Sequence, residues 1–207
     1  MAEPTVFDIC ERAVGLVRGH RLDISLEARV NALDYRRLIS DRAQEEAVNC
    51  VRHFPGARDG LLHAWPWVFA RRSATPARLA TPLPGWAYSY ALPADCVRLM
   101  GLAWSGGDVP AWTQEGNVVG CDRDAAIHYT SRGVSVGQWP PLFVDALVLR
   151  LASEICVAVQ GDVSALPALE RRFEITMAEA WRSGAVDTRS GLPLDGYGWD
   201  GYSRSPE

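Results

Sequence analysis

The spacing of apolar residues changes twice along this chain, and that change limits the possible folds more than any other feature. Apolar residues recur at three- and four-residue spacing up to Trp65, alternate between residues 67 and 132, and return to helical spacing after Pro140. The pattern predicts an α+β fold, in which a bundle of about four helices packs with a small antiparallel β-domain of about five strands and an extended C-terminal tail follows. We expect an N-terminal helical part at residues 1–66, a β-domain at 67–134, a helix pair that completes the bundle at 135–183 and the tail at 184–207.

Two helices are predicted in the N-terminal part. The first runs from Thr5 to about Arg18, where Gly19 is placed to end it. The second runs from Asp41 to about Ala64, and Asp41 with Gln44 has the spacing of a capping box. Residues 27–37, which lie between them, show no clear period.

Two further helices are predicted after the β-domain. Residues 142–159 are apolar almost all round, so this helix should be the most buried of the bundle. Within it, Arg150 and Glu154 are spaced to pair across one turn. A last helix is expected from about Ser164 to Arg182.

The β-domain shows alternation in several short runs. In "WAYSYALP", the alternation places Trp86, Tyr88 and Tyr90 on one face of a strand. The residues Glu115-Gly116-Asn117 have the composition of a hairpin tip. These runs favour an antiparallel meander or a small barrel.

An unusual density of aromatic residues marks the point where the helical period gives way to the strand period. We interpret it as a packed structural hinge, in which Pro55 kinks the second helix and Pro66 ends it. Trp67 and Phe69 would begin the alternation of the first strand, and Trp67 should be buried. The predicted hinge residues are Pro55, Trp65, Pro66, Trp67 and Phe69.

The composition excludes several classes of protein. The net charge of −4 and the absence of a basic stripe argue against a dedicated nucleic-acid binder, although every basic residue except histidine is arginine. No apolar run reaches the roughly 20 residues that span a bilayer, and the N-terminus does not resemble a secretory signal, so we expect no membrane partner and assembly in a cytoplasm. Five separated cysteines without a C-x-x-C pair favour buried thiols over disulfides or a zinc site.

The sequence contains none of the common catalytic or phosphate-binding motifs, so we expect no enzyme, no cofactor and no metal. Three alternatives stay open. Asp122 and Asp124 could bind a cation, although a polar turn is the commoner role of such a pair. Cys96 and His128 could form the thiol–imidazole pair of a small hydrolase. The aromatic strands, with their arginines, could stack the bases of single-stranded nucleic acid.

The last 24 residues, 184–207, show no period and are rich in Gly, Ser and Asp. Three aromatic residues recur within them, and spaced Tyr and Trp side chains are common anchors in a partner's pockets. The candidate partner contacts are Tyr197, Trp199 and Tyr202. The alternative is that the tail has no role.

Two segments carry a resemblance to a known family. "FPGARDGLLHAWPWVFARR" (residues 54–72) and "WAYSYALPADCVRLMGL" (residues 86–102) resemble the tail tubular protein A family of phage head-to-tail adaptors, also called gatekeeper or connector proteins. The family pattern has a Tyr/Phe-Pro, an Arg-Asp pair, a His-Pro-Trp-x-Phe-Ala segment and then W-x-Y-x-Y-x-L-P-x-D-C-L-R. Here Trp65 replaces the usual His and Val68 replaces a common Asn. The final two predicted helices also resemble the family's C-terminal pair.

The resemblance implies a structural virion protein without catalysis. Such proteins form a ring of twelve copies under the portal, connect the capsid to the tail, and leave an axial channel for DNA ejection. The implied partners are the portal protein, a tail nozzle or tail-tube protein, further copies of the chain in a cyclic homo-oligomer, and double-stranded DNA that passes without specific binding. The implied location is the virion neck, and Tyr197, Trp199 and Tyr202 become candidate contacts with the portal or a neighbouring subunit. Another neck or tail-completion ring protein stays an alternative, because both are rings without chemistry.

Overall fold

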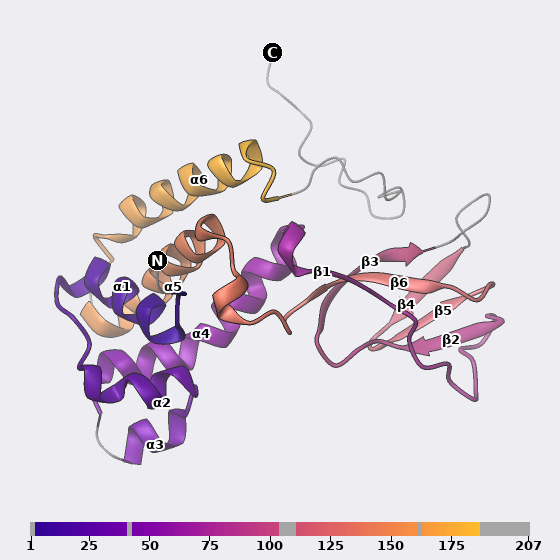
Figure 1. The fold of residues 1–207 in the computed structure, drawn as a ribbon, viewed down its shortest axis with the longest axis horizontal. Helices are drawn as coiled ribbons and strands as arrows, with labels where there is room; N and C mark the ends of the chain where they lie inside the picture. Colours follow the sequence, from indigo (N-terminus) through magenta and orange to yellow (C-terminus); the bar gives the residue numbers. More distant parts are fainter. Residues whose placement is uncertain (1–2, 41–42, 104–110, 161–162, 187–207) are drawn as a thin grey trace. The chain divides into compact units, whose positions relative to one another are not determined.

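The computed structural model of the chain describes residues 3–40, 43–103, 111–160 and 163–186. These residues divide into two compact units. We call the described residues up to Phe69 and from Gly133 to Val186 the helical unit, and those of Ala70–Arg132 the β-unit. The α+β class expected from the sequence is confirmed, with helices in one unit and antiparallel sheets in the other (Figure 1).

The described part of the helical unit contains six α-helices, two more than the sequence predicted. The additional helices are short and fill the stretch that showed no clear period. The helices are α1 (Val6–Arg18), α2 (Glu27–Asn31), α3 (Tyr35–Ser40), α4 (Glu45–Ala64), α5 (Pro141–Gln160) and α6 (Leu166–Arg182).

Both ends of α1 are fixed by the residues that the sequence indicated. The Thr5 hydroxyl accepts a hydrogen bond from the Asp8 backbone N–H at 3.1 Å, while the Asp8 carboxylate accepts one from the Thr5 N–H at 2.8 Å. Gly19 then adopts the left-handed conformation with φ 71°, and its N–H donates to the Gly15 carbonyl. A residue with a Cβ is disfavoured in this conformation, so glycine ends the helix here.

The start of α4 differs from the prediction. Asp41 lies outside the described residues, and α4 begins at Glu45 with Gln44 as its N-cap. Gln44 makes no side-chain capping bond; its Oε1 instead accepts from the Asp23 N–H at 2.9 Å. The capping-box role of Gln44 was therefore wrong, because the amide is engaged by the preceding loop. The helix continues through Pro55 to Ala64.

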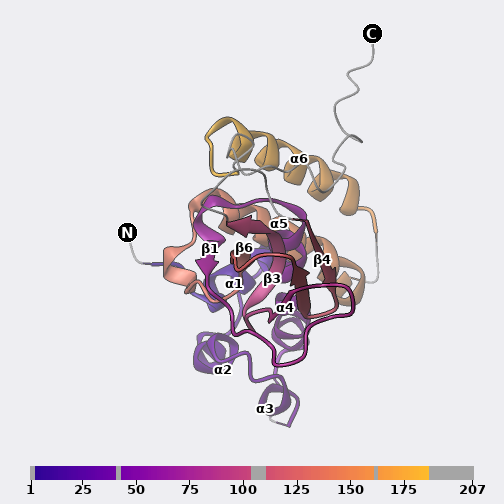
Figure 2. The same ribbon diagram turned by 90° about the vertical axis from the view of Figure 1, so that its right-hand side faces the viewer.

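Helix α5 is the centre of the helical unit, as its all-round apolar sequence predicted. It packs against α1, α4 and α6. In both views α6 lies on one side of α5, and α2 and α3 lie at the opposite side of the unit (Figure 1 and Figure 2). The Arg150 Nε donates to Glu154 Oε1 at 3.1 Å, which confirms the predicted pair. Among the described residues, no helix has the length and apolar character needed to cross a membrane.

The described part of the β-unit contains two three-stranded antiparallel sheets, in the orders β1-β6-β3 and β2-β5-β4. The meander or barrel that the sequence favoured was therefore wrong, because β5 and β6 each occupy the centre of a separate sheet. The strands are β1 (Arg71–Ala74), β2 (Tyr88–Ala91), β3 (Cys96–Ala103), β4 (Trp112–Glu115), β5 (Val118–Cys121) and β6 (Ala126–Ser131).

One apolar cluster contains side chains of both sheets, so the sheets pack face to face. Tyr90 and Val119 contribute from one sheet, and Ile127 and Leu99 from the other. Strands β4 and β5 form the predicted hairpin, with Gly116 at φ 58° in its two-residue turn. Left-handed conformations of this kind favour glycine in tight hairpins.

Trp86 does not share a face with Tyr88 and Tyr90, contrary to the prediction. Trp86 precedes β2, and a Cβ added to Gly120 would lie only 2.8 Å from Cγ of the Trp86 ring. Gly120 pairs with Ser89, and directly paired residues project from the same face of a sheet. Trp86 therefore covers the face opposite the core cluster, and only a glycine at position 120 allows the indole so close.

Candidate interaction surfaces

The aromatic segment after α4 is anchored in the helical unit. Trp67 is 1% exposed and its ring packs edge-on against Phe143 of α5, with centroids 4.9 Å apart. Its indole N–H donates to the Leu61 carbonyl at 3.1 Å, so the one polar atom of the side chain is satisfied. Phe69 and Trp139 also contact Phe143, at 4.8 and 5.1 Å. We call Phe54, Trp67, Phe69, Trp139 and Phe143 the aromatic cluster.

The backbone of this segment departs from the predicted strand. Residues Val68–Ala70 form a 3₁₀ turn, and β1 begins only at Arg71. Trp67 forms an isolated antiparallel bridge with Val186, and the Val68 N–H donates to the Ala185 carbonyl at 3.1 Å. The expectation that Trp67 and Phe69 begin the alternation of the first strand was therefore wrong. The burial of Trp67 agrees with the prediction.

The other residues of the predicted hinge lie at different places. Trp65 follows the last residue of α4 in an extended conformation, as a residue before Pro66 should, and packs edge-on against Trp181 at 5.3 Å. Trp181 is 41% exposed, so this tryptophan pair lies at the surface. Pro55 lies in the middle of α4, half-buried, and is not part of the aromatic cluster.

A groove on the helical unit lies between α1 and α6, with α5 at its floor. Its volume is about 510 Å³. Its floor is apolar, with Val148 and Leu149 from α5, and Ile175 of α6 forms a wall that is 52% exposed. Arg12 and Asp145 form an ion pair at its edge. Local sequence patterns did not predict this groove, because α1 is distant in sequence from the α5 and α6 pair that completes it.

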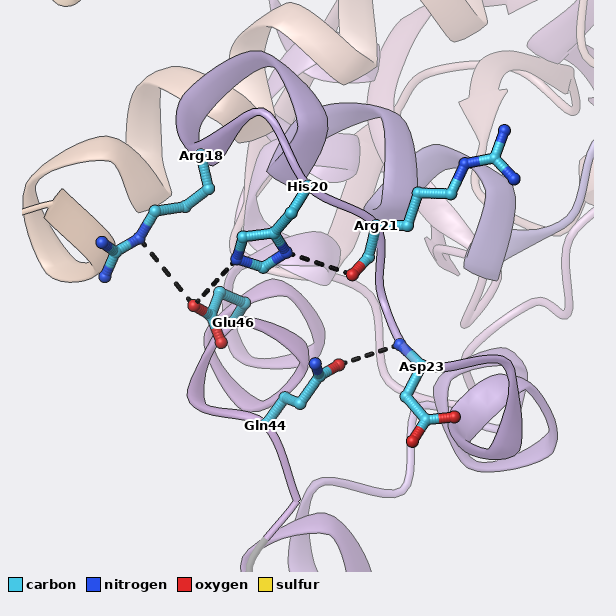
Figure 3. Close-up of polar contacts among 6 residues, drawn as sticks. All are labelled: Arg18, His20, Arg21, Asp23, Gln44 and Glu46. Atoms are coloured by element: carbon cyan, nitrogen blue, oxygen red, sulfur yellow. Dashed lines mark hydrogen bonds and ion pairs between the residues drawn. The ribbon is translucent and has the colours of Figure 1, made fainter.

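A polar cluster joins the end of α1 and its loop to the start of α4 (Figure 3). Arg18 Nε and His20 Nε2 both approach Glu46 Oε1, at 3.8 and 3.5 Å. The other ring nitrogen of His20 lies 3.1 Å from the Arg21 carbonyl. With the bond from the Asp23 N–H to Gln44, these contacts fix the loop against α4 and serve as structural contacts of the unit.

In the β-unit, the hydroxyls of two buried tyrosines donate to carboxylates. The Tyr90 hydroxyl donates to Asp124 at 2.5 Å, and burial, followed by that bond and the Asp124 charge, raises the pKa of Tyr90 to about 12. Tyr129 donates to Asp95 at 3.3 Å, and burial and the Asp95 charge raise its pKa as well. Asp124 is thus engaged by a phenol. The described residues contain no group of three or more His, Cys, Asp or Glu side chains arranged to hold a metal ion.

Cys96 and His128 do not form the pair that one alternative requires. Cys96 pairs with Ser131 across β3 and β6, whereas His128 pairs with Gly101 and Ser73. Cys96 packs against the core cluster with Ile127 and Tyr129, so His128, which lies between those two in sequence, projects from the other face of the sheet. Burial, ahead of the neighbouring Asp95 charge, raises the pKa of Cys96, which disfavours the thiolate that a nucleophile needs.

His128 instead contacts Ser73, whose hydroxyl lies 2.7 Å from the His128 Nδ1. Burial and the Arg71 charge lower the pKa of His128, which favours the neutral imidazole. Where a histidine serves as the base of a serine nucleophile, a carboxylate usually orients its ring. The described contacts of His128 include no carboxylate. The two residues are direct cross-strand partners, and the bond has the geometry of a structural contact between strands.

The aromatic strands turn their rings inward. Tyr90 and Tyr129 are 2% and 6% exposed, and Tyr88 and Trp112 pack against the same cluster. Bases stack on exposed rings, so these residues serve the core rather than a nucleic-acid surface. Arg78 lies over the Tyr88 ring at 4.3 Å, which is a cation–π contact.

The three aromatic residues proposed as partner contacts, Tyr197, Trp199 and Tyr202, lie outside the described residues. The described chain ends at Val186, which is buried in the helical unit beside Trp67. Gly184 to Val186, which were predicted to belong to the tail, thus contribute to the packing of the helical unit. Neither a protein-family model nor a curated protein matches the chain.

Proposed function

We propose that this chain is a phage head-to-tail adaptor, which forms a ring under the portal, connects the capsid to the tail and leaves a channel through which DNA passes. The observation that carries the proposal is the pair of motifs at residues 54–72 and 86–102, which resemble the tail tubular protein A family. The first motif supplies Phe54, Trp67 and Phe69 to the aromatic cluster, and the second supplies β2 and much of β3.

Three features of the structure support a role in assembly. Prominent aromatic residues of both motifs are buried in packing contacts. They therefore stabilise the fold and are not exposed to bind a substrate. The alternatives that need chemistry lack support in the described residues, since Cys96 and His128 lie on opposite faces of a sheet. A cyclic ring also needs different, complementary surfaces on its two sides, and the helical unit offers a groove that could serve as one of them.

The charge of the chain fits a conduit for DNA. With a net charge of −4, a ring of this chain would not hold phosphates by a basic wall, so DNA could pass without being retained.

Two binding measurements test the proposal. The purified protein should co-sediment with the portal protein of the phage that encodes it, and should not retard double-stranded DNA in a gel at moderate salt. Tight binding to DNA that weakens steeply with salt would contradict the conduit, and failure to co-sediment with the portal would contradict the adaptor.

A further inference from the structure

We propose that the groove between α1 and α6 receives the segment Tyr197–Tyr202 of a second copy of this chain. The inference rests on the proposed function, because it assigns one contact between neighbouring subunits of the ring. It replaces the choice between portal and neighbour with a single occupant and a defined site.

The shape of the groove suits a segment with a few large side chains. Its volume of about 510 Å³ lies in the range of sites that hold compact apolar ligands. Val148 and Leu149 form a fixed floor, since both are buried in α5, while Ile175 leaves half of its surface uncovered. A partner that covered Ile175 would remove apolar surface from water, which favours association.

The chemistry of the segment complements this groove. Residues 195–202 read "DGYGWDGY", in which Asp-Gly-Tyr occurs twice with Trp199 between the copies. These eight residues, which include the segment Tyr197–Tyr202, hold three aromatic side chains, two carboxylates and no basic residue. The rim of the groove carries two guanidinium groups, Arg12 and Arg172, against the single carboxylate of Asp145. Aromatic anchors in an apolar groove with acidic groups at an arginine-bearing rim form a complementary pair.

The length of chain beyond the helical unit is sufficient for the contact. Eleven residues, 187–197, follow Val186 up to and including Tyr197, the first aromatic anchor. An extended chain spans up to about 3.3–3.6 Å per residue. The segment can therefore extend roughly 35 Å from its own subunit, which is farther than the diameter of a small helical bundle. A groove on one copy and a segment on the next also make a heterologous contact, the type that closes a ring.

Crosslinking between isotopically distinct copies tests the contact directly. One copy carries a photo-crosslinking phenylalanine derivative in place of Trp199 and is labelled with nitrogen-15; the other copy is unlabelled and unmodified. We expect crosslinked peptides that join the labelled residue 199 to α1 or α6 of the unlabelled copy. Crosslinks confined to labelled peptides, crosslinks to the portal alone, or none to these helices would overturn the inference.

Substitutions in the groove provide the matched controls. Ile175→Glu places a charge on an exposed wall, and Gly15→Leu fills the groove from α1 at a position where a Cβ meets only the His20 carbonyl, at 3.9 Å. Each should lower the yield of crosslinks between copies by about tenfold, as loss of a hot-spot contact does. Gly60→Leu makes the same change at another helix-interior glycine with open space, outside the groove, and should leave the yield unchanged. Equal yields from Gly15→Leu and Gly60→Leu would overturn the inference.

The same variants separate this inference from the proposed function. A protein truncated after Val186 should lose the contact, whereas one truncated after Tyr202 should keep it. When the Ile175→Glu protein is mixed with the protein truncated after Val186, one intact groove meets one intact segment, so only a one-to-one pair should form. If none of these changes affects association but the protein still attaches to the portal, the inference fails and the adaptor proposal stands. Groove crosslinks in a protein that never attaches to the portal would support the contact between copies and contradict the adaptor proposal.

Discussion

The helical unit and the β-unit bury their aromatic residues in different ways. In the helical unit, Trp67 and Trp139 pack on Phe143, and each indole donates its one hydrogen to a backbone carbonyl. In the β-unit, Tyr90 and Tyr129 donate to the carboxylates of Asp124 and Asp95. The aromatic cluster of the helical unit contains no titratable group, while the aromatic core of the β-unit contains two tyrosines that bond to aspartate side chains. Packing should therefore dominate the stability of one unit, and pH should affect that of the other.

The largest expected effect is the loss of a ring from the aromatic cluster. Trp67→Ala should lower the free energy of unfolding by about 3–5 kcal/mol, because the side chain is buried and its removal leaves a cavity. Trp181→Ala, at a half-exposed partner of Trp65, should cost about 1 kcal/mol. Urea unfolding measures the losses, and hydrogen exchange locates them in the helical unit. Similar losses for the two variants would show that the aromatic cluster is not the centre of this unit.

The next effect is in the β-unit, at the contact between Gly120 and Trp86. Gly120→Ala places a Cβ within 2.8 Å of the Trp86 ring, so either the indole or the strand must move. We expect a cost of about 1–3 kcal/mol, with faster hydrogen exchange in β5. Adding Trp86→Leu should recover part of that loss, because it removes the colliding ring. No recovery in the double variant would mean that the glycine serves another purpose.

The pH dependence of the β-unit gives a smaller effect. The pKa of Tyr90 is raised to about 12 in the folded chain, above the value of about 10 for an exposed phenol. Folding therefore favours the neutral phenol, and its contribution to stability is complete below pH 10 and is lost as the pH rises towards 12. Tyr129, whose pKa is also raised, adds to this loss.

Tyr90→Phe isolates this contribution. It should cost about 1 kcal/mol near neutral pH by removing the bond to Asp124, and should reduce the fall in stability between about pH 9 and pH 11. Urea midpoints of the β-unit at the two pH values provide the measurement. An unchanged difference between them would show that Tyr90 does not titrate with folding.

The smallest effect is a gain in the helical unit. Gly60 lies inside α4, and a Cβ at this position would have no atom of a neighbouring residue within 4 Å, so Gly60→Ala adds helix propensity without a collision. The expected gain is about 0.5–1 kcal/mol in urea unfolding. A loss instead would indicate that the open space beside α4 is filled in the native protein.

The long helices were predictable because each bears a local signal. Thr5 and Gly19 mark the ends of α1, and the continuous apolar character of residues 142–159 identifies the central helix. The short helices α2 and α3 have only five and six residues, too few for a period to emerge. Their formation depends on contacts such as the Phe7 N–H with the Asn31 side chain, 24 residues away.

The order of strands and the groove could not be predicted from local patterns. Alternation indicates where a strand lies but not its neighbour, and β6 pairs with β1 across more than fifty residues. The face of Trp86 depends on the absence of a side chain at Gly120 in another strand. The groove likewise requires α1, α5 and α6 to be in place before Leu16, Val148 and Ile175 come together.

Electron cryo-microscopy of the purified portal mixed with an excess of this protein tests the central claim most directly. The expected image is a second ring of density under the portal, coaxial with it and leaving an open channel. The helical unit and the β-unit should both fit the density of each subunit of that ring. Portal particles that gain no density at saturating protein would contradict the claim that this chain is a head-to-tail adaptor.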